Sequence, residues 1–288
     1  MQEITLKTPA KVNIFLRVIR KRPDGYHDLQ MVMLPLSLYD EIQLKLRPAG
    51  IDITVDGISD KGMAGEKNLA YRAAKIISEK TGKKLGVRIE LTKNIPVAAG
   101  LGGGSSDAAA VLKGLNELWE LGLATDKLAE LGKTLGADVP FFCHNGPAFV
   151  EGIGDRVTVY DSFPNLSFLL INPGFSVSTS WIYKQWDLQL TLHTPDARVR
   201  PLFQVFSDVI ASLHNDLERV TISAHPEIET IKTALKDAGA KGVLMSGSGP
   251  TVFGVFAEKA SRDAAREHIN DKKWRVFSAE GLAAECKS

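Results

Sequence analysis

Alternation between apolar and polar residues predicts several β-strands in this chain. Between Lys11 and Arg20, apolar side chains recur at every second position, which is the period of a half-buried strand. A turn is predicted directly afterwards at Arg22-Pro23-Asp24-Gly25, because proline and glycine each favour particular backbone angles. Further strands are predicted over residues 41–46, 51–55, 87–93, 168–171, 242–245, 251–257 and 274–278, and a hairpin over 148–159.

Helical periodicity lies between these strands. Asn68 is the predicted N-cap of a helix that runs to about Lys80, with its apolar residues on one face. A second helix is expected to open near Ser105 or Ser106, and Thr125 is expected to cap a third that continues to residue 135. Later helices are predicted over 178–186, 202–213, 226–238 and 258–269. Because helices and strands interleave in both halves, the sequence predicts an α+β protein with two lobes, divided between residues 163 and 164.

The bulk composition narrows the class of protein. The chain has 288 residues, of which 44% are hydrophobic and 24% charged, and its formal net charge is +1. This balance is not the strongly basic footprint expected of a nucleic-acid-binding protein. No apolar run reaches the ~20 residues of a membrane span, and the first eleven residues lack the core of a signal peptide. Cys143 and Cys286 lie far apart without metal-ligand spacing, so we expect a reduced, cytoplasmic protein.

The segment at residues 96–107 reads PVAAGLGGGSSD and runs directly into an alanine-rich helix. Its glycines can adopt positive φ and fold their N–H groups around an anion, and the helix N-terminus adds further unpaired N–H groups. We interpret it as a phosphate-binding loop, with a plain surface turn as the alternative. No lysine follows Gly104 as in a Walker loop, and the glycine spacing does not fit a dinucleotide fingerprint. The two commonest phosphate loops are therefore excluded.

Three short motifs occur in order along the chain: PAKVN at 9–13, the glycine loop at 96–107 and SGSGPT at 246–251. In this order and spacing they resemble the motifs of the small-molecule kinase superfamily named after galactokinase, homoserine kinase, mevalonate kinase and phosphomevalonate kinase (GHMP). The resemblance covers essentially the whole chain. It implies a two-lobed GHMP-kinase fold, with an N-terminal lobe like domain 2 of ribosomal protein S5 that binds ATP and carries catalysis (1–163). The C-terminal lobe (164–288) would be ferredoxin-like α/β and bind substrate.

Four longer matches point to one branch of this superfamily: AKVNIFL at 10–16, RPDGYH at 22–27, GGGSSDAA at 102–109 and GADVPF at 136–141. The branch they resemble transfers the γ-phosphoryl group of ATP to a hydroxyl of 4-diphosphocytidyl-2-C-methyl-D-erythritol. The product is the 2-phosphate, an intermediate of non-mevalonate isoprenoid precursor biosynthesis. A homoserine or mevalonate type of GHMP kinase is the alternative, and a non-catalytic nucleotide-binding protein is a third. Nucleic-acid and membrane partners are not expected, and the sequence leaves the oligomeric state open.

The resemblance also implies an ATP site and a catalytic pair. The expected ATP-binding residues are Pro96, Val97, Ala98, Ala99, Gly100, Leu101, Gly102, Gly103, Gly104, Ser105 and Ser106. Asp138 would accept or orient the proton of the substrate hydroxyl, while Lys11 would keep that carboxylate ionised and favour the developing alkoxide. Judged by spacing alone, Lys11 is interpreted as an ordinary solvated strand lysine, and Asp138 fits either a helix cap or turn residue or a catalytic carboxylate. Mg²⁺ is expected to arrive with ATP, and the motifs assign no protein residue as its ligand.

The substrate-binding residues implied by the resemblance are Asn13, Tyr26, His27, Thr179, Tyr183 and Lys184. Asn13 should share a strand face with Lys11. Tyr26 and His27 would recognise the cytidine by stacking and at the polar edge of the base. Tyr183 and Lys184 resemble a second aromatic–basic pair, for which Trp181 and Trp186 are alternative aromatics. The loop at 246–250 would close over the diphosphate, with a tight turn between strands as the alternative.

Overall fold

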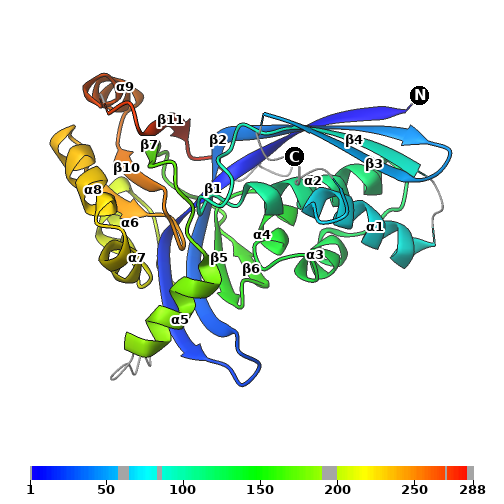
Figure 1. The fold of residues 1–288 in the computed structure, drawn as a ribbon, viewed down its shortest axis with the longest axis horizontal. Helices are drawn as coiled ribbons and strands as arrows, with labels where there is room; N and C mark the ends of the chain where they lie inside the picture. The colour runs from blue at the N-terminus through cyan, green and yellow to red at the C-terminus, as the bar shows by residue number, and fades with distance from the viewer. Residues whose placement is uncertain (1, 58–64, 83–85, 190–199, 270, 284–288) are drawn as a thin grey trace. The chain divides into compact units, whose positions relative to one another are not determined.

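The computed structural model describes residues 2–57, 65–82, 86–189, 200–269 and 271–283 (Figure 1). The chain divides into two compact units that interleave in sequence. Unit 1 comprises residues 1–10, 39–95 and 102–145, and unit 2 comprises 11–38, 96–101 and 146–288. The strands β1 (Glu3–Lys21) and β2 (His27–Arg47) each have one part in either unit. A boundary after residue 163 stays a prediction of the sequence.

Unit 1 packs helices against a small mixed sheet. Strand β4 (Gly86–Thr92) pairs antiparallel with residues 41–47 of β2 and parallel with β3 (Ile51–Asp56). The helices of this unit lie on one side of these strands in Figure 1. They are α1 (Leu69–Thr81), α2 (Gly103–Leu118), α3 (Thr125–Lys133) and α4 (Val139–Cys143). α2 packs against α1 and α4, so it is the central helix of the unit.

The helices of unit 1 follow their sequence signals closely. The Asn68 side chain accepts a hydrogen bond from the Ala70 N–H at 2.8 Å, which confirms it as the N-cap of α1. Residues 108–112 of α2 are all buried, as expected of a helix covered on several sides. The three alanines at 108–110 let α2 approach its neighbours. Gly114 is so close to Leu44 that an added Cβ would lie 2.6 Å from the Cδ1 atom of Leu44.

Unit 2 contains a hairpin and a separate four-stranded sheet. The predicted hairpin is present as β5 (Ala148–Gly152) and β6 (Arg156–Val159), and β5 pairs antiparallel with residues 29–33 of β2. The four-stranded sheet is antiparallel, in the order β11 (Arg275–Glu280), β7 (Ser167–Asn172), β10 (Val252–Phe256), β9 (Gly242–Met245). The short strand β8 (His214–Asn215) pairs in parallel with Phe15 and Leu16 of β1.

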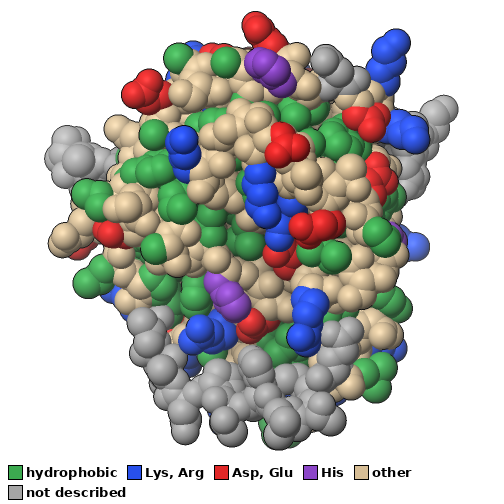
Figure 2. Space-filling model, turned by 90° about the vertical axis from the view of Figure 1, so that its left-hand side faces the viewer, with side chains coloured by type: hydrophobic (Ala, Val, Ile, Leu, Met, Phe, Trp, Pro, Cys, Tyr) green, Lys and Arg blue, Asp and Glu red, His purple; other side chains and the backbone are tan. Residues whose placement is uncertain are grey.

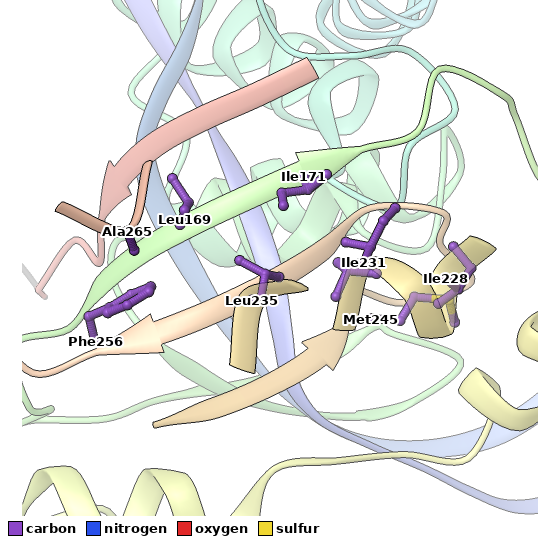
Figure 3. Packing of buried hydrophobic residues seen from close by; sticks show 9 residues of the cluster. Leu169, Ile171, Ile228, Ile231, Leu235, Met245, Phe256 and Ala265 are labelled. Atoms are coloured by element: carbon purple, nitrogen blue, oxygen red, sulfur yellow. The ribbon is translucent and has the colours of Figure 1, made fainter. Parts of the chain in front are cut away.

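In the described part of unit 2, the helices that accompany these strands are α5 (Thr179–Gln189), α6 (Phe206–Ser212), α7 (Glu218–Ala224), α8 (Glu227–Asp237) and α9 (Lys259–His268). Figure 3 shows Ile228, Ile231 and Leu235 of α8 and Ala265 of α9 in one hydrophobic cluster with side chains of the four-stranded sheet. Ile231 and Leu235 are fully buried in this cluster. Burial of these apolar faces is what holds α8 and α9 to the sheet.

Several expected boundaries were wrong. β2 begins at His27 rather than residue 41, because residues 29–36 are buried without interruption and show no apolar–polar alternation. Thr125 is the first residue of α3, whose N-cap is Ala124. α6 begins at Phe206 instead of residue 202, and α7 and β8 were not expected. Cys286 and most of the polar stretch 191–200 lie outside the described residues.

The surface agrees with the near-neutral net charge. Figure 2 shows a face on which acidic and basic side chains lie next to one another among hydrophobic and uncharged groups. Within the described part of the chain, no helix has both the length and the apolar character to cross a bilayer.

Candidate active site

The glycine-rich loop turns directly into the N-terminus of α2. Gly100 and Gly102 have φ angles of +77° and +70°, in the left-handed region that residues with a side chain rarely adopt. Gly102 is the N-cap, and Gly103 and Gly104 form the start of the first turn without side chains. The first N–H groups of a helix have no partner within it and carry the positive end of its dipole. The loop therefore ends in a cradle suited to a phosphate group.

α2 begins at Gly103, so the helix opens near the expected serines, and Ser105 and Ser106 lie within its first turn. The helix begins earlier because Gly102 adopts the left-handed cap conformation. Ser106 is buried and its backbone N–H donates to the Gly102 carbonyl at 2.9 Å. Its Oγ atom is buried and has no hydrogen-bond partner among the described residues. A buried hydroxyl without a partner at a helix N-terminus fits a ligand oxygen or a metal ion carried by a nucleotide.

A buried ion cluster holds the loop at both ends. Lys93 donates to the carboxylates of Asp40 and Asp107, the latter at 2.7 Å from Nζ to Oδ2. Asp40 Oδ1 also accepts the backbone N–H groups of Asn94 at 2.6 Å and Ile95 at 2.8 Å, directly before the loop. Asp107 lies in α2, directly after the loop. One lysine thus ties together the segments that enter and leave the phosphate cradle.

The charges of this cluster depend on one another. Burial raises the pKa of Asp107 to about 6, against the opposing effect of Lys93 and of the hydrogen bond from Thr8 Oγ1. Burial alone would lower the pKa of Lys93, but the carboxylates of Asp107 and Asp40 outweigh it and raise that pKa. Lys93 is therefore a fixed cation beneath the loop. Gly103 leaves no room here, since an added Cβ would lie 3.2 Å from both Lys93 Nζ and Asp40 Oδ2.

Lys11 is buried rather than solvated, with 4% of its surface exposed. Its backbone N–H donates to the Leu101 carbonyl at 2.9 Å, and its Nζ donates to Asn13 Oδ1 at 2.5 Å. The predicted shared face of Lys11 and Asn13 is therefore confirmed. The Asn13 N–H donates to Ser246 Oγ at 3.3 Å, and Ser246 Oγ donates to the Gly100 carbonyl at 2.9 Å. Residues of all three short motifs thus meet within unit 2.

The third motif forms a turn between β9 and β10 and also touches the glycine loop. The two ends of the turn are joined by the Ser246 N–H, which donates to the Thr251 carbonyl at 2.9 Å. The Thr251 N–H donates to the carbonyl of Ala99 in the glycine loop at 3.3 Å. Asn215 of β8 donates to the carbonyls of Met245 and Gly247, both at 2.8 Å. The expected tight turn between strands is therefore present, and it lies against the glycine loop. Closure over a diphosphate stays a prediction.

Asp138 is the N-cap residue of α4, but its side chain makes no capping hydrogen bond to that helix. It is half-buried. α4 packs against α2, and a Cβ added at Gly136 would lie 3.7 Å from Ser105 Oγ. Within unit 1, Asp138 therefore begins a helix that packs against the helix of the phosphate cradle. Lys11 belongs to unit 2, so the catalytic pairing of these two residues stays a prediction.

The aromatic residues expected at the substrate come from the β1–β2 turn and from α5. Tyr26 is 59% exposed, whereas the adjacent His27 is only 7% exposed. The His27 ring stacks on Tyr183 with 4.7 Å between ring centroids and 20° between planes, and meets Trp186 edge-on at 5.8 Å. Trp186 is buried, while Trp181 is 39% exposed. His27 and Tyr183 are therefore brought together, and Trp186 is a packing neighbour of His27.

Lys184 and Thr179 occupy other positions of the same helix. Lys184 is exposed. Thr179 Oγ1 shares a hydrogen bond of 2.8 Å with Ser248 Oγ, which attaches the start of α5 to the third motif. Sequence reasoning missed Asp187, although its position four residues after Tyr183 places it on the same helix face. It also missed the buried cluster of Asp40, Lys93 and Asp107, which no spacing rule predicts.

Comparison with known proteins places this site in a family. Residues 68–146 match the GHMP kinases N terminal domain, and residues 201–275 match the GHMP kinases C terminal domain. The 4-diphosphocytidyl-2-C-methyl-D-erythritol kinase of Geobacter metallireducens is 49% identical over 98% of this chain and 100% of its own length. The protein of the same name from Syntrophus aciditrophicus is 46% identical, over 97% of this chain and 99% of its own.

Comparison with solved structures points to the same family. A crystal structure of 4-(cytidine 5′-diphospho)-2C-methyl-D-erythritol kinase superimposes with a TM-score of 0.82 at 33% identity, covering 98% of this chain and 100% of that one. Homoserine kinase from Cytophaga hutchinsonii gives a TM-score of 0.74 at 20% identity, over 98% and 95% of the two chains, and so shares the fold. The expected α+β GHMP fold is confirmed. The chain therefore belongs to the GHMP kinases and, among them, to the family of 4-diphosphocytidyl-2-C-methyl-D-erythritol kinases.

Proposed function

We propose that this chain transfers the γ-phosphoryl group of ATP to a hydroxyl of 4-diphosphocytidyl-2-C-methyl-D-erythritol, giving the 2-phosphate and ADP. The reaction belongs to non-mevalonate isoprenoid precursor biosynthesis and takes place in the cytoplasm. The observation that carries the choice of substrate is the His27–Tyr183 stack beside the exposed Tyr26. Homoserine and mevalonate contain no base, so a kinase for either would have no use for this aromatic group. The family membership supports the same choice.

The chain's own residues position ATP. The loop from Pro96 to Leu101 and the open N-terminus of α2 bind the phosphates through backbone N–H groups. Lys93, Asp40 and Asp107 keep the two ends of the loop together, so the cradle is formed before ATP arrives.

Mg²⁺ bound with ATP supplies charge neutralisation on the phosphates. The hydroxyl groups of Ser105 and Ser106 would bind this Mg²⁺. The Oγ atom of Ser106 fits that role because it is buried and has no hydrogen-bond partner among the described residues.

Asp138 and Lys11 serve the acceptor side of the reaction. The acceptor hydroxyl forms a bond to the γ-phosphorus while the bond to the β–γ bridging oxygen breaks and ADP leaves. Asp138 takes the hydroxyl proton. Lys11 favours the developing negative charge on the attacking oxygen. Asn13, bound to Lys11 Nζ, keeps that cation in place and extends the polar surface toward the substrate.

A coupled ADP-release assay with purified protein tests the substrate. We expect turnover of 4-diphosphocytidyl-2-C-methyl-D-erythritol with a kcat/KM about 5- to 150-fold above that for mevalonate or homoserine, because only the first offers a base for stacking (~1–3 kcal/mol per stacked base). ³¹P NMR of the product identifies the phosphorylated hydroxyl. A preference for mevalonate or homoserine would overturn the assignment, and the absence of ADP release with all three would favour a non-catalytic protein.

Asp138→Asn tests the proton acceptor. The amide keeps the shape of the side chain but cannot take a proton, so we expect kcat to fall by about 10²–10⁴. The KM for ATP should change less than threefold, and the melting temperature should be retained. Asp126→Asn, at an exposed position in the first turn of α3, is the matched control and should leave kcat unchanged. Near-normal kcat in Asp138→Asn would remove Asp138 from the mechanism.

A further inference from the structure

The turn between β1 and β2 is joined to α5 by one carboxylate. Asp187 Oδ2 accepts a hydrogen bond from Lys21 Nζ at 2.6 Å, and Asp187 Oδ1 accepts one from His27 Nε2 at 2.8 Å. Lys21 is the last residue of β1 and His27 the first of β2, so Asp187 binds one residue from each strand. Figure 1 shows α5 beside this turn, and all three residues belong to unit 2.

The charge state of Asp187 suits this role. Burial by itself would raise the pKa of Asp187, but the hydrogen bonds from Lys21 and His27 outweigh burial and lower that pKa. The carboxylate is therefore ionised at neutral pH and accepts the Nε2 proton of His27. Hydrogen bonds to an ionised acceptor are stronger than those between neutral groups. The Asp187 side chain is 20% exposed and the His27 side chain 6% exposed, so water competes little for this contact.

His27 in turn determines how Tyr183 is presented. Tyr183, Trp186 and Asp187 are spaced i, i+3 and i+4 along α5 and share one helix face. Tyr183 stacks on one side of the His27 ring at 4.7 Å, while Trp186 meets that ring edge-on. Since His27 covers one face of the tyrosine ring, a second planar group can stack only on the opposite face.

We propose that Asp187 is a positioning residue for cytidine recognition. By holding His27 against Tyr183, it fixes the ring on which the base stacks before the substrate arrives. Pre-positioning of this kind lowers the entropy lost on binding and so appears in substrate affinity. Asp187 acts through His27 and makes no contact with the substrate. The inference rests on the proposed function, because it names the cytosine base as the group that Tyr183 receives.

The variant Asp187→Asn tests the proposal. It retains the size of the side chain but loses the charge that binds Lys21 and orders His27. We expect the KM for 4-diphosphocytidyl-2-C-methyl-D-erythritol to rise about tenfold, while kcat and the KM for ATP change less than twofold. Asp28→Asn is the matched control: Asp28 lies next to His27, but its carboxylate binds Arg20 at 2.7 Å and Arg22 at 3.3 Å. This control should leave all three constants unchanged.

A double-mutant cycle shows whether the effect passes through His27. In a His27→Ala background, Asp187→Asn should change the substrate KM less than twofold, because the group that it positions is gone. If the role of Asp187 were merely structural, Asp187→Asn would raise the substrate KM further in the His27→Ala background. It would then raise the KM for ATP as well. Either of those results, or an unchanged substrate KM in the single variant, would overturn the proposal.

Direct binding separates this inference from the proposed function. Cytidine 5′-diphosphate is titrated into the free protein by calorimetry, with uridine 5′-diphosphate as the comparison. If Asp187→Asn weakens cytidine diphosphate binding about tenfold while the wild type turns over no substrate, the function falls and the inference stands. If the wild type is an active kinase but the variant binds cytidine diphosphate equally well, the inference falls and the function stands. No binding of cytidine diphosphate to the wild type would overturn the inference, while the ADP-release assay decides the function.

Discussion

At the scale of single residues, the buried carboxylate of Asp107 makes the stability of the protein depend on pH. Burial raises its folded-state pKa to about 6, above the ordinary value of 3.8. A carboxyl group with a raised pKa binds its proton more tightly in the folded chain than in the unfolded one. Its contribution to stability is therefore complete below about pH 4 and is lost as the pH rises through 6. The loss is on the order of 2–3 kcal/mol, at 1.36 kcal/mol per pKa unit.

Asp107→Asn removes this titration. We expect the free energy of unfolding of the wild type, relative to the variant, to fall between pH 4 and pH 6 and to level off above 6. Urea unfolding at several pH values measures it. Thr8→Val is the control, because it removes the hydrogen bond to Asp107 but keeps the titrating carboxyl group, so its pH dependence should persist. Parallel pH profiles for the wild type and Asp107→Asn would contradict the expectation.

At the scale of elements, the sequence was most informative where one face of an element is buried and the other is wet. The helix after Asn68 has such faces and was predicted within a few residues. The hairpin at 148–159 was also predicted, although only β6 alternates in burial, while β5 is buried along most of its length. The first half of β2 was missed because it is buried throughout, which removes the alternation on which a strand prediction depends. β8 was missed because it has only two residues and pairs with a strand about 200 positions earlier.

The same limit applies to the elements of the candidate site. The glycine loop was recognisable because the conformations it needs are restricted to glycine, and the structure places positive φ at Gly100 and Gly102. The ion cluster of Asp40, Lys93 and Asp107 was not recognisable, because these three charged residues come from separate segments of the chain and meet only through the tertiary fold. Asp187 is an intermediate case: helix periodicity predicts its shared face with Tyr183, but not its contact with His27.

At the scale of the whole molecule, two of the three short motifs, at 9–13 and 96–107, span places where the chain passes from one unit to the other. The chain crosses after residues 10, 38, 95, 101 and 145. Lys11 directly follows the first crossing, and the crossings after 95 and 101 delimit the first part of the glycine loop. β1 and β2 also contribute residues to both units. Neither unit can therefore unfold without releasing strands and loop ends that the other unit needs.

This interleaving predicts a single cooperative unfolding transition in which activity and both units are lost together. Trp119 is the only tryptophan of unit 1, and Trp181, Trp186 and Trp274 belong to unit 2. A variant that retains only Trp119 and the variant Trp119→Phe therefore report on the units separately. In urea, we expect the fluorescence midpoints of the two variants to agree with each other and with far-UV circular dichroism. ADP-release activity of the wild type should vanish over the same range, since its loop requires both units. Two separated midpoints would show instead that one unit stays folded alone, and the kinase activity should then follow the less stable of the two.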